Sequence, residues 1–262
     1  MRHGLEGPER DDRAPPAPAG THSIANGARL VREGRCDMAV TAGSSEAALT
    51  PVGIQGFANM TALSSDGVSR PFDRERDGFV MAEGAAVLVL EECDSARARG
   101  APILGEIVGG ASTADAHHIT APAPGGTGAI RCMELALADA GLASDDVTHV
   151  NAHGTGTPLN DAAEAEAVAK VFGGTGPPMT STKGVHGHAL GAAGALEAAA
   201  VLLSMEHRAI PPTFGCTTFD PELPALDLVR DEPRAWEPGI TLSNSFGFGG
   251  HNGTLVLGPP PG

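Results

Sequence analysis

The second half of the chain alternates short apolar runs with longer stretches whose apolar residues recur at helical spacing. The short runs have the length of buried strands, and the longer stretches resemble helices that turn one face to a core. Because strands that alternate with helices pack those helices against a sheet, this pattern predicts an α/β fold with a mixed sheet that has helices on both faces. The expected strands and helices are, in order, 101–112, 127–142, 147–154, 160–172, 178–183 and 191–207, followed by two terminal strands at 240–245 and 252–258.

The N-terminal part of the chain contains a shorter version of the same pattern. Small and apolar positions recur at helical spacing from Thr21 to Gly34, which predicts a helix there. The segment 36–46 is expected to contain a buried strand, and the apolar run 85–92 is typical of the interior of a sheet. A long polar insert, 50–78, separates these two strands.

The segment before the first helix has a different character. Residues 14–18 are a run of Pro and Ala, which removes backbone donors and disfavours a helix. We therefore expect residues 1–19 to be a disordered leader outside the packed fold. We expect the rest to form two units, 20–100 and 101–262, with a boundary near Gly100.

Composition narrows the classes of function. A chain of 262 residues with 41% hydrophobic content can bury one sizeable core or two small ones. The formal net charge of −15, from 17 basic and 32 acidic residues, argues against a nucleic-acid surface, because phosphate binding needs clustered Lys and Arg. There is no long apolar run and no signal core, and the four widely spaced cysteines suit free thiols, so we expect a cytoplasmic protein without a membrane span.

Polar residues that could carry chemistry follow the expected strands. His153 lies in "NAHGTGTPLND" after one strand, and Lys183 and His188 lie in "TSTKGVHGHALGAAG" after the next. Ligands of α/β proteins bind at such strand ends. The glycine-rich turn in "NSFGFGGHNGTLV" can bring bare backbone N–H groups close to a ligand. We also expect Asn160 or Asp161 to cap the helix after the first loop.

Simpler interpretations compete with these. A single His at a strand end is more often a hydrogen-bonded structural residue than a catalytic one. We expect that structural role for His3, His22, His117, His149 and His207. His153, His186 and His188 could be imagined as zinc ligands, but they lack the usual spacing and a carboxylate or thiolate partner, so we expect no metal. The segment "GFGGHNG" resembles a dinucleotide fingerprint but lies between two strands instead of opening a helix.

Three loop segments taken in order are more specific than any one of them. The segments "NAHGTGTPLND", "STKGVHGHALGAAGALEA" and "SNSFGFGGHNGTLV", preceded by "SRPFDRERDGFVMAEGAAVLVLEE", resemble the β-ketoacyl-acyl-carrier-protein synthase family, in particular the elongating enzymes of dissociated fatty-acid and polyketide systems. The resemblance covers residues 20–258. It implies a thiolase-like, layered α-β-α-β-α architecture with mixed sheets, of which this chain would contain an incomplete first half. Gly156, His251 and Ala82 depart from the Ser, Thr and Gly that are common at these positions.

The resemblance implies a decarboxylative Claisen condensation of malonyl-carrier protein with an acyl thioester, in fatty-acid or polyketide biosynthesis. His153 and His188 would donate hydrogen bonds that stabilise the enolate formed as CO2 leaves. Lys183 would organise this pair, and Glu197 would support it from a helix.

Substrate-binding roles follow from the same resemblance. Thr155 and Thr157 would contact the pantetheine arm. The amide of Phe248 would supply half of an oxyanion hole, with its ring at the acyl channel, and Phe79 would line the same pocket. No cofactor of the protein's own is implied, because the phosphopantetheine arrives on the acyl carrier protein. That carrier protein is the expected partner, and the family forms homodimers or heterodimers.

One residue of the family's chemistry is missing. The resemblance places Ala17 where the family has its nucleophilic Cys, so we expect this chain as written to form no acyl-enzyme and to perform no condensation. It also lacks the family's region upstream of that Cys, which would leave sheet edges exposed and favour aggregation. Two alternatives remain: a non-condensing partner, resembling chain-length factors or decarboxylase variants that lack the Cys, and an unrelated metal-dependent hydrolase that a metal assay would reveal.

A shifted reading frame would explain the missing Cys. The codons ACC GCC TGC GCC encode Thr-Ala-Cys-Ala, and the same bases one position later encode Pro-Pro-Ala-Pro, which is the sequence of residues 15–18. We therefore predict that the codon of Pro16 ends in T. Any other third base at that codon would make Ala17 a genuine replacement.

Overall fold

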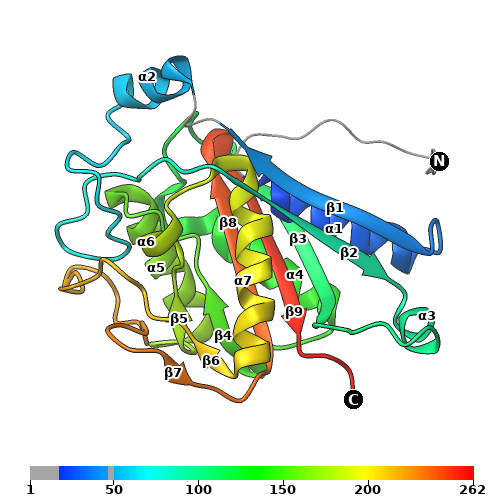
Figure 1. The fold of residues 1–262 in the computed structure, drawn as a ribbon. Coiled ribbons are helices and arrows are strands. Elements are labelled where there is room, and N and C mark those ends of the chain that lie inside the picture. Colours follow the sequence, from blue (N-terminus) through cyan, green and yellow to red (C-terminus); the bar gives the residue numbers. More distant parts are fainter. Residues whose placement is uncertain (1–17, 47–49) are drawn as a thin grey trace.

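The computed structural model describes residues 18–46 and 50–262, and Figure 1 shows the arrangement of its elements. The helices are α1 (Ala19–Arg32), α2 (Pro51–Asn59), α3 (Cys93–Ala98), α4 (Thr127–Ala140), α5 (Pro158–Phe172), α6 (Lys183–His186) and α7 (Ala193–His207). The strands are β1 (Met38–Ser45), β2 (Gly84–Glu91), β3 (Glu106–Ala114), β4 (Val147–Asn151), β5 (Met179–Thr180), β6 (Ala209–Ile210), β7 (Arg234–Ala235), β8 (Ile240–Gly247) and β9 (His251–Gly258).

A mixed five-stranded sheet forms the centre of the molecule, with the order β3-β9-β8-β4-β5. β4 runs parallel to β5 and β8, whereas β9 runs antiparallel to β8 and β3. A separate two-stranded sheet pairs β1 with β2 in an antiparallel register that runs from Met38↔Glu91 to Ser45↔Gly84. β6 and β7 form a short antiparallel pair.

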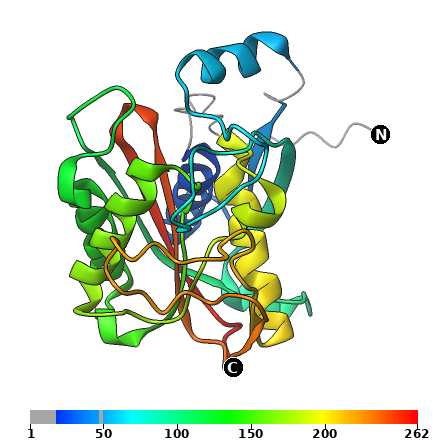
Figure 2. The ribbon, with the colours of Figure 1, turned by 90° about the vertical axis from the view of Figure 1, so that its left-hand side faces the viewer.

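The elements stack in layers, which are seen side-on in Figure 2. Helices α4 and α5 lie on one side of the five-stranded sheet, and α1 and α7 pack against its other face. The two-stranded sheet lies on the far side of α1 and α7. The described residues therefore show an α-β-α-β order, which confirms the mixed sheet with helices on both faces.

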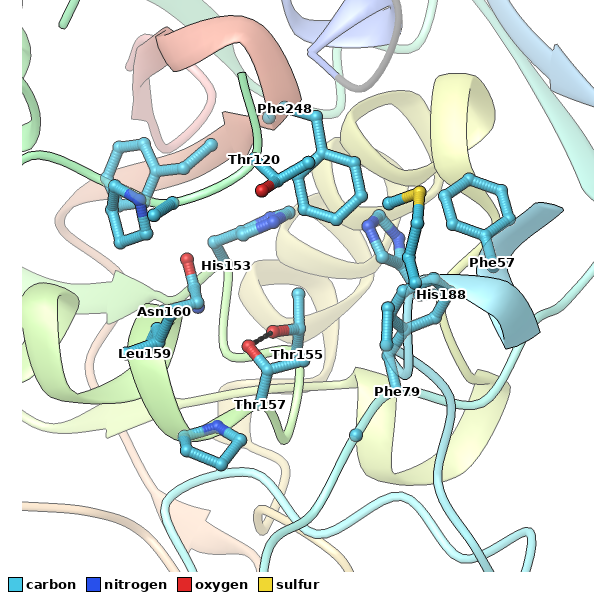
Figure 3. Close-up of a pocket in the computed structure, with 18 of the residues that line it drawn as sticks. Phe57, Phe79, Thr120, His153, Thr155, Thr157, Leu159, Asn160, His188 and Phe248 are labelled. Carbon is cyan, nitrogen blue, oxygen red and sulfur yellow. Dashed lines mark hydrogen bonds between the residues drawn. The ribbon is translucent and has the colours of Figure 1, made fainter. Parts of the chain in front are cut away.

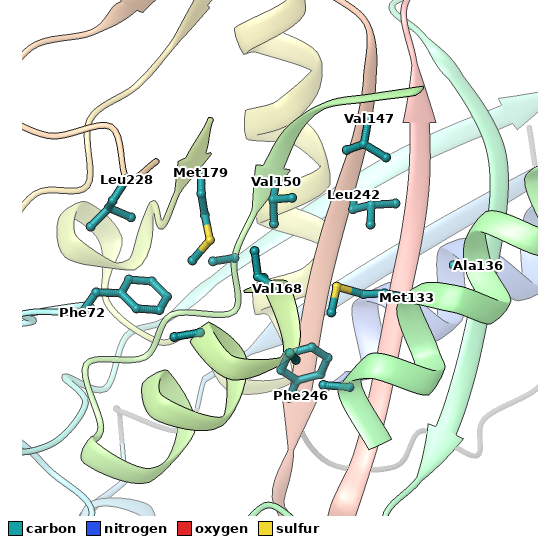
Figure 4. Close-up of a cluster of buried hydrophobic side chains, with 14 of the residues drawn as sticks. Phe72, Met133, Ala136, Val147, Val150, Val168, Met179, Leu228, Leu242 and Phe246 are labelled. Atoms are coloured by element: carbon teal, nitrogen blue, oxygen red, sulfur yellow. The ribbon is translucent and has the colours of Figure 1, made fainter. Parts of the chain in front are cut away.

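Two clusters of buried side chains hold these layers together. The larger, shown in Figure 4, joins Met133 of α4 and Val168 of α5 to Val150 and Leu242 of the five-stranded sheet. The smaller cluster lies around α1 and α7, between the two sheets.

The smaller cluster, between the two sheets, includes Ile24, Leu88, Val201 and Leu255. Because α1 and α7 lie between two sheets, they must approach each other closely. A Cβ added at Gly20 of α1 would lie 2.6 Å from the backbone nitrogen of Ala195 in α7, so only glycine fits there.

The predicted elements are present, but several boundaries differ. The strand expected at 101–112 begins only at Glu106, and the segment 178–183 contains a two-residue strand, after which α6 begins at Lys183. The insert 50–78 was expected to be a polar connection, but it contains α2. The side chain of Thr50 caps this helix by accepting a hydrogen bond from the Gly53 N–H at 3.3 Å, so a local capping signal outweighed the polar composition.

The expectation that the run 85–92 lies in a sheet interior is wrong. Val87 and Val89 of β2 are 62% and 58% exposed. The physical reason is that helices cover only one face of the two-stranded sheet in the described residues, so alternate residues of a continuous apolar run point outward.

The predicted leader lies almost wholly outside the described residues, which begin at Pro18. The predicted division into units near Gly100 stays a prediction. None of the helices in the described ranges is both long and apolar enough to cross a membrane.

Candidate active site

His153 stands at the end of β4 and is held by carboxylates from the following helix. Its backbone N–H donates to Oε1 of Glu164 at 2.8 Å, and the N–H of Gly154 donates to Oε2 of the same residue at 2.8 Å. The N–H groups of Thr155 and Gly156 donate to Asp161. The loop that carries His153 is therefore fixed through its own backbone.

These two carboxylates were missed as site residues by the sequence analysis. Asp161 was expected as a helix cap, but α5 begins earlier, with Thr157 as its N-cap residue and no side-chain capping bond. Asp161 instead lies in the first turn and also accepts from the Phe72 N–H, at 2.8 Å. The available signal was Asp161 in the first turn of a helix beside a glycine-rich loop, with Glu164 three residues further along the same helix.

Both carboxylates are fully buried, which affects their protonation. Burial raises the pKa of Glu164 to about 7, and the hydrogen bonds from Gly154 and His153 partly lower it. Burial also raises the pKa of Asp161, against the hydrogen bond from Phe72. The anchoring of the loop therefore depends on pH.

His188 reaches the same place from a different part of the chain. It follows α6, and its backbone N–H donates to the carbonyl of Val80 at 2.7 Å. Its ring lies 5.2 Å from the ring of His153, edge-on at 84°, and 5.2 Å from the ring of Phe79. Nδ1 of His188 is buried and has no hydrogen-bond partner among the described residues.

Lys183 lies behind the two imidazoles and is completely buried. Its Nζ lies 3.4 Å from Nδ1 of His153 and forms an ion pair with Glu197 of α7. Burial raises the pKa of Glu197 to about 7, and the neighbouring Lys183 partly opposes this. Since an ammonium can only donate, its contact with Nδ1 assigns the ring proton of His153 to Nε2.

The two histidines are neutral at pH 7. Burial lowers the pKa of both His153 and His188 well below the usual value, and the charge of Lys183 lowers it further. Two neutral imidazoles can each donate one N–H hydrogen bond. The two imidazoles therefore suit the stabilisation of a developing oxyanion by hydrogen bonds more than its neutralisation by a positive charge.

A cavity of about 690 Å³ opens in front of the histidines, and Figure 3 shows how its lining residues lie. Thr155 and Thr157 lie below His153 in this view, with their hydroxyl oxygens 2.9 Å apart. Phe79 lies beside His188, and Phe248 comes from the turn between β8 and β9.

Phe57 of α2 completes an aromatic wall that the sequence analysis did not anticipate. Its ring centroid lies 5.3 Å from that of Phe79 and 6.2 Å from that of Phe248. The sequence analysis did not consider Phe57 because this residue lies in the segment 50–78, which was interpreted as a polar connection. The cavity thus combines an apolar wall with hydroxyl and imidazole groups, as pockets for chain-like ligands do.

The start of α1 lies beside this cavity. Gly191 lines the cavity, and a Cβ built on it would lie 3.8 Å from Cβ of Ala19. Thr21 of α1 donates to Oγ of Ser245 in β8 at 2.9 Å. Ala17, the position predicted to correspond to a nucleophile, lies outside the described residues.

His186 does not join the other two histidines. Its Nε2 lies 2.8 Å from Oγ1 of Thr182, and its Nδ1 lies 2.8 Å from the carbonyl oxygen of Gly187. Within residues 18–46 and 50–262, no group of three His, Cys, Asp or Glu side chains is placed to hold a metal ion. The metal-hydrolase alternative therefore has no supporting cluster there.

Family models match most of the chain. The model described as "Beta-ketoacyl synthase, N-terminal domain" matches residues 17–96, and the model described as "Beta-ketoacyl synthase, C-terminal domain" matches residues 104–217.

Curated relatives agree with these models. The chain is 47% identical over 246 residues to a 3-oxoacyl-[acyl-carrier-protein] synthase 2 of Synechocystis, covering 91% of this chain and 59% of the relative. It is 46% identical over 244 residues to the protein of the same name from Staphylococcus aureus, covering 91% and 60%. The chain thus spans about 60% of the length of these relatives.

Solved structures show the same similarity. A beta-ketoacyl synthase from Burkholderia phymatum has a TM-score of 0.89 and 38% identity, covering 93% of this chain and 60% of that one. The ishigamide ketosynthase/chain length factor has a TM-score of 0.88 at 38% identity, with coverage of 93% and 59%. A ketosynthase in complex with its type II polyketide acyl-carrier protein has a TM-score of 0.90 at 34% identity, with coverage of 93% and 61%.

Proposed function

Because the chain belongs to the beta-ketoacyl synthase family, we propose that its pocket serves decarboxylative Claisen chemistry on thioesters delivered by an acyl carrier protein. The observation that carries this proposal is the buried cluster of His153, His188 and Lys183 at the wall of a largely apolar cavity. Neutral imidazoles can stabilise an enolate by donating hydrogen bonds to its oxygen, and the apolar wall keeps bulk water out of the site.

The decarboxylation step uses the histidines as hydrogen-bond donors. The bond between the malonyl carboxylate and its neighbouring carbon breaks, CO2 leaves, and the electron pair forms an enolate on the thioester. When no acyl thioester accepts this enolate, its carbon takes a proton from the solvent, which gives the acetyl thioester. Nε2–H of His153 donates to the enolate oxygen, because Lys183 occupies the Nδ1 side of the ring. His188 donates from the adjacent ring.

The condensation step needs a nucleophile in addition. The enolate carbon attacks the carbonyl of an acyl group held as a thioester, and a thiolate leaves. Ala17 supplies no thiol at the position that the family resemblance assigns to the nucleophile. For this chain as written, the decarboxylation half of the chemistry is the activity that the described side chains support.

The pocket walls suit the parts of such a substrate. Thr155 and Thr157 offer hydroxyl groups to the amides of a pantetheine arm, and Phe57, Phe79 and Phe248 offer an apolar surface to an acyl chain. The backbone amide of Phe248 completes the oxyanion site for the acyl carbonyl. The protein uses no cofactor of its own in this proposal, because the phosphopantetheine arrives on the carrier.

The partner is an acyl carrier protein, in a cytoplasmic setting. One similar solved structure is a ketosynthase in complex with its carrier protein, and another is a ketosynthase in complex with its chain length factor. These similarities support both carrier binding and association with a second subunit as a homodimer or heterodimer.

Mass spectrometry of malonyl-carrier protein tests the proposal. We expect conversion to acetyl-carrier protein by the chain, and a rate at least about 100-fold lower for His153→Ala, because a lost oxyanion donor typically costs that much. His207→Ala, at the exposed end of α7, is the matched control. Equal rates for the chain and for His153→Ala would contradict the proposal.

A non-condensing partner subunit is the second candidate, and Ala17 is the observation that favours it. The variant Ala17→Cys separates the two candidates. If the chain retains a synthase site, the variant should gain an acyl adduct at residue 17 and condense, whereas the unmodified chain should show neither. If it is a partner subunit, the variant should gain no condensing activity alone.

A further inference from the structure

Helix α2 stands apart from the layered body of the protein in both ribbon views (Figure 1 and Figure 2). None of its nine residues is buried, and the side chain of Val52 is 84% exposed. Helix α4, by contrast, buries Cys132, Met133 and Ala136 completely. Packing therefore holds α2 much more weakly than it holds the helices of the layers.

The sequence of α2 adds little stability of its own. The helix has nine residues, fewer than the roughly 12–15 that an isolated helix needs in water. It contains Gly53 and Gly56, and glycine is among the poorest helix formers. Its capping bond, from the Gly53 N–H to Thr50, is local, and so is the bond from the side chain of Gln55 to the next turn. Neither bond ties α2 to the body of the protein.

An aromatic contact joins α2 to the cavity. Of the residues of α2, Phe57 is the one that lines the cavity, and its ring packs against the rings of Phe79 and Phe248. Phe79 is buried, its N–H donates to the carbonyl of Ala62 at 3.0 Å, and its carbonyl accepts from the Ser64 N–H at 2.9 Å. The segment after α2 is therefore fixed by backbone bonds, whereas α2 reaches the cavity through one side chain.

Thr61 lies between this fixed segment and α2. Its φ is +51°, in the left-handed region that a β-branched residue rarely adopts. Its bonds are local, because its N–H donates to the carbonyl of Ala58 at 2.9 Å and its hydroxyl donates to the carbonyl of Met60 at 2.7 Å. A strained residue at the end of an element can absorb a change of backbone direction, so Thr61 is a suitable hinge for α2.

We propose that α2 is a lid that closes on the cavity through Phe57 when an acyl chain lies inside. An acyl chain adds apolar surface beside Phe57 and Met60, which both line the cavity. Burying that surface stabilises the closed position of α2 over an open one, so the ligand shifts the population towards closure. The proposal rests on the acyl-binding role proposed above for the pocket and uses no catalytic step.

Hydrogen exchange of the full-length chain, measured by mass spectrometry, tests the lid. The probe is S-dodecanoyl-pantetheine, whose binding is first measured by calorimetry. Without the probe, the amides of residues 54–60 should exchange much faster than those of residues 132–140 in α4. At saturation with the probe, exchange at 54–60 should slow at least about tenfold, and exchange in α4 should not change.

The outcomes separate the lid from the proposed function. Slow exchange in α2 without the probe would overturn the lid, because it would show a firmly docked helix. Binding of the probe without a change in α2 would also overturn the lid, and it would leave the acyl-binding role intact. A chain that does not bind the probe would overturn the acyl-binding role and the lid together. The decarboxylation assay decides the catalytic proposal separately.

Two substitutions in α2 sharpen the test. Phe57→Ala removes the ring that closes the lid, so the probe should bind about tenfold more weakly and should no longer slow exchange in α2. Val52→Thr changes an exposed side chain of the same helix that does not line the cavity, so affinity and slowed exchange should both be unchanged. Continued protection of α2 by the probe in Phe57→Ala, or equal losses in the two variants, would overturn the proposal.

Discussion

The five-stranded sheet and the two-stranded sheet of β1 and β2 contain similar residues but differ in how they are buried. Val150, Leu242 and Leu255 of the five-stranded sheet are completely buried, whereas Val40, Val87 and Val89 of the two-stranded sheet are 63%, 62% and 58% exposed. The first sheet has helices on both faces, and the second has helices on one face in the described residues. The comparison teaches that burial of a strand depends on the layers around it, because an apolar side chain is removed from water only by a second packed surface.

The candidate site depends on both regions. His153, Lys183 and His188 belong to the five-stranded region, which holds them by buried hydrogen bonds and an ion pair. Phe57 and Phe79 come from the chain between β1 and β2. The imidazoles and the lysine of the candidate site are thus on the firmly packed side, and part of its aromatic wall is on the lightly packed side.

The largest effect is expected where a buried charge in the firmly packed region loses its partner. Lys183→Ala leaves the carboxylate of Glu197 buried without a cation, which should lower the free energy of unfolding by about 3–5 kcal/mol. The double variant Lys183→Met, Glu197→Leu removes both charges and should recover most of this loss. Urea unfolding measures the three proteins, and a double variant as unstable as the single one would contradict the argument.

One substitution made in both sheets tests the comparison directly. Val150→Ala in β4 removes methyl groups from a fully buried site and should cost about 2.5 kcal/mol. Val89→Ala in β2, where the side chain is mostly exposed, should cost less than about 0.5 kcal/mol. Similar losses in the two variants would show that the outer face of the two-stranded sheet is covered in solution.

Low pH should destabilise the firmly packed region, because this region buries the neutral side chain of His149. This residue was expected to be a hydrogen-bonded structural histidine, but neither ring nitrogen has a partner among the described residues. It packs against Trp236 with ring centroids 5.3 Å apart, and burial lowers its pKa to about 3.

The sign follows from proton binding. Below pH 6.5 the unfolded chain protonates this histidine and the folded chain does not, so stability falls as the pH falls from 6.5 towards 3. At pH 5 the loss from His149 should be about 2 kcal/mol. His149→Phe should lose less stability than the unmodified chain between pH 7 and 5, with His207→Phe as control. Parallel pH curves for the chain and His149→Phe would count against this assignment.

The smallest effect on stability is expected on the outer face of the two-stranded sheet. Val40→Thr and Val87→Thr replace exposed side chains with polar ones of similar shape, so unfolding should change by less than about 0.5 kcal/mol. Aggregation and the binding of an apolar dye should decrease, because these side chains form an exposed apolar surface beside unpaired strand edges in the described residues. Unchanged aggregation would place its cause elsewhere.

Local patterns predicted the elements and the loops of the site well. The helices expected at 127–142 and 191–207 are α4 and α7, and the loop that carries His153 follows β4 as expected. The resemblance named His153, His188 and Lys183 together, and the structure brings them to one place. Their catalytic roles stay a prediction, as do those of Thr155, Thr157, Phe79, Phe248 and Glu197.

The sequence by itself determined the longer helices, such as α1, α4, α5 and α7, because hydrophobic spacing and capping residues act within a few positions of the chain. It also determined the family, through motifs whose order is preserved. Only the tertiary structure decided that Glu164 holds the loop of His153 and that Val87 and Val89 face outward. Each of these results depends on register and on layer packing between distant segments, and such long-range contacts leave no periodic signal in the chain.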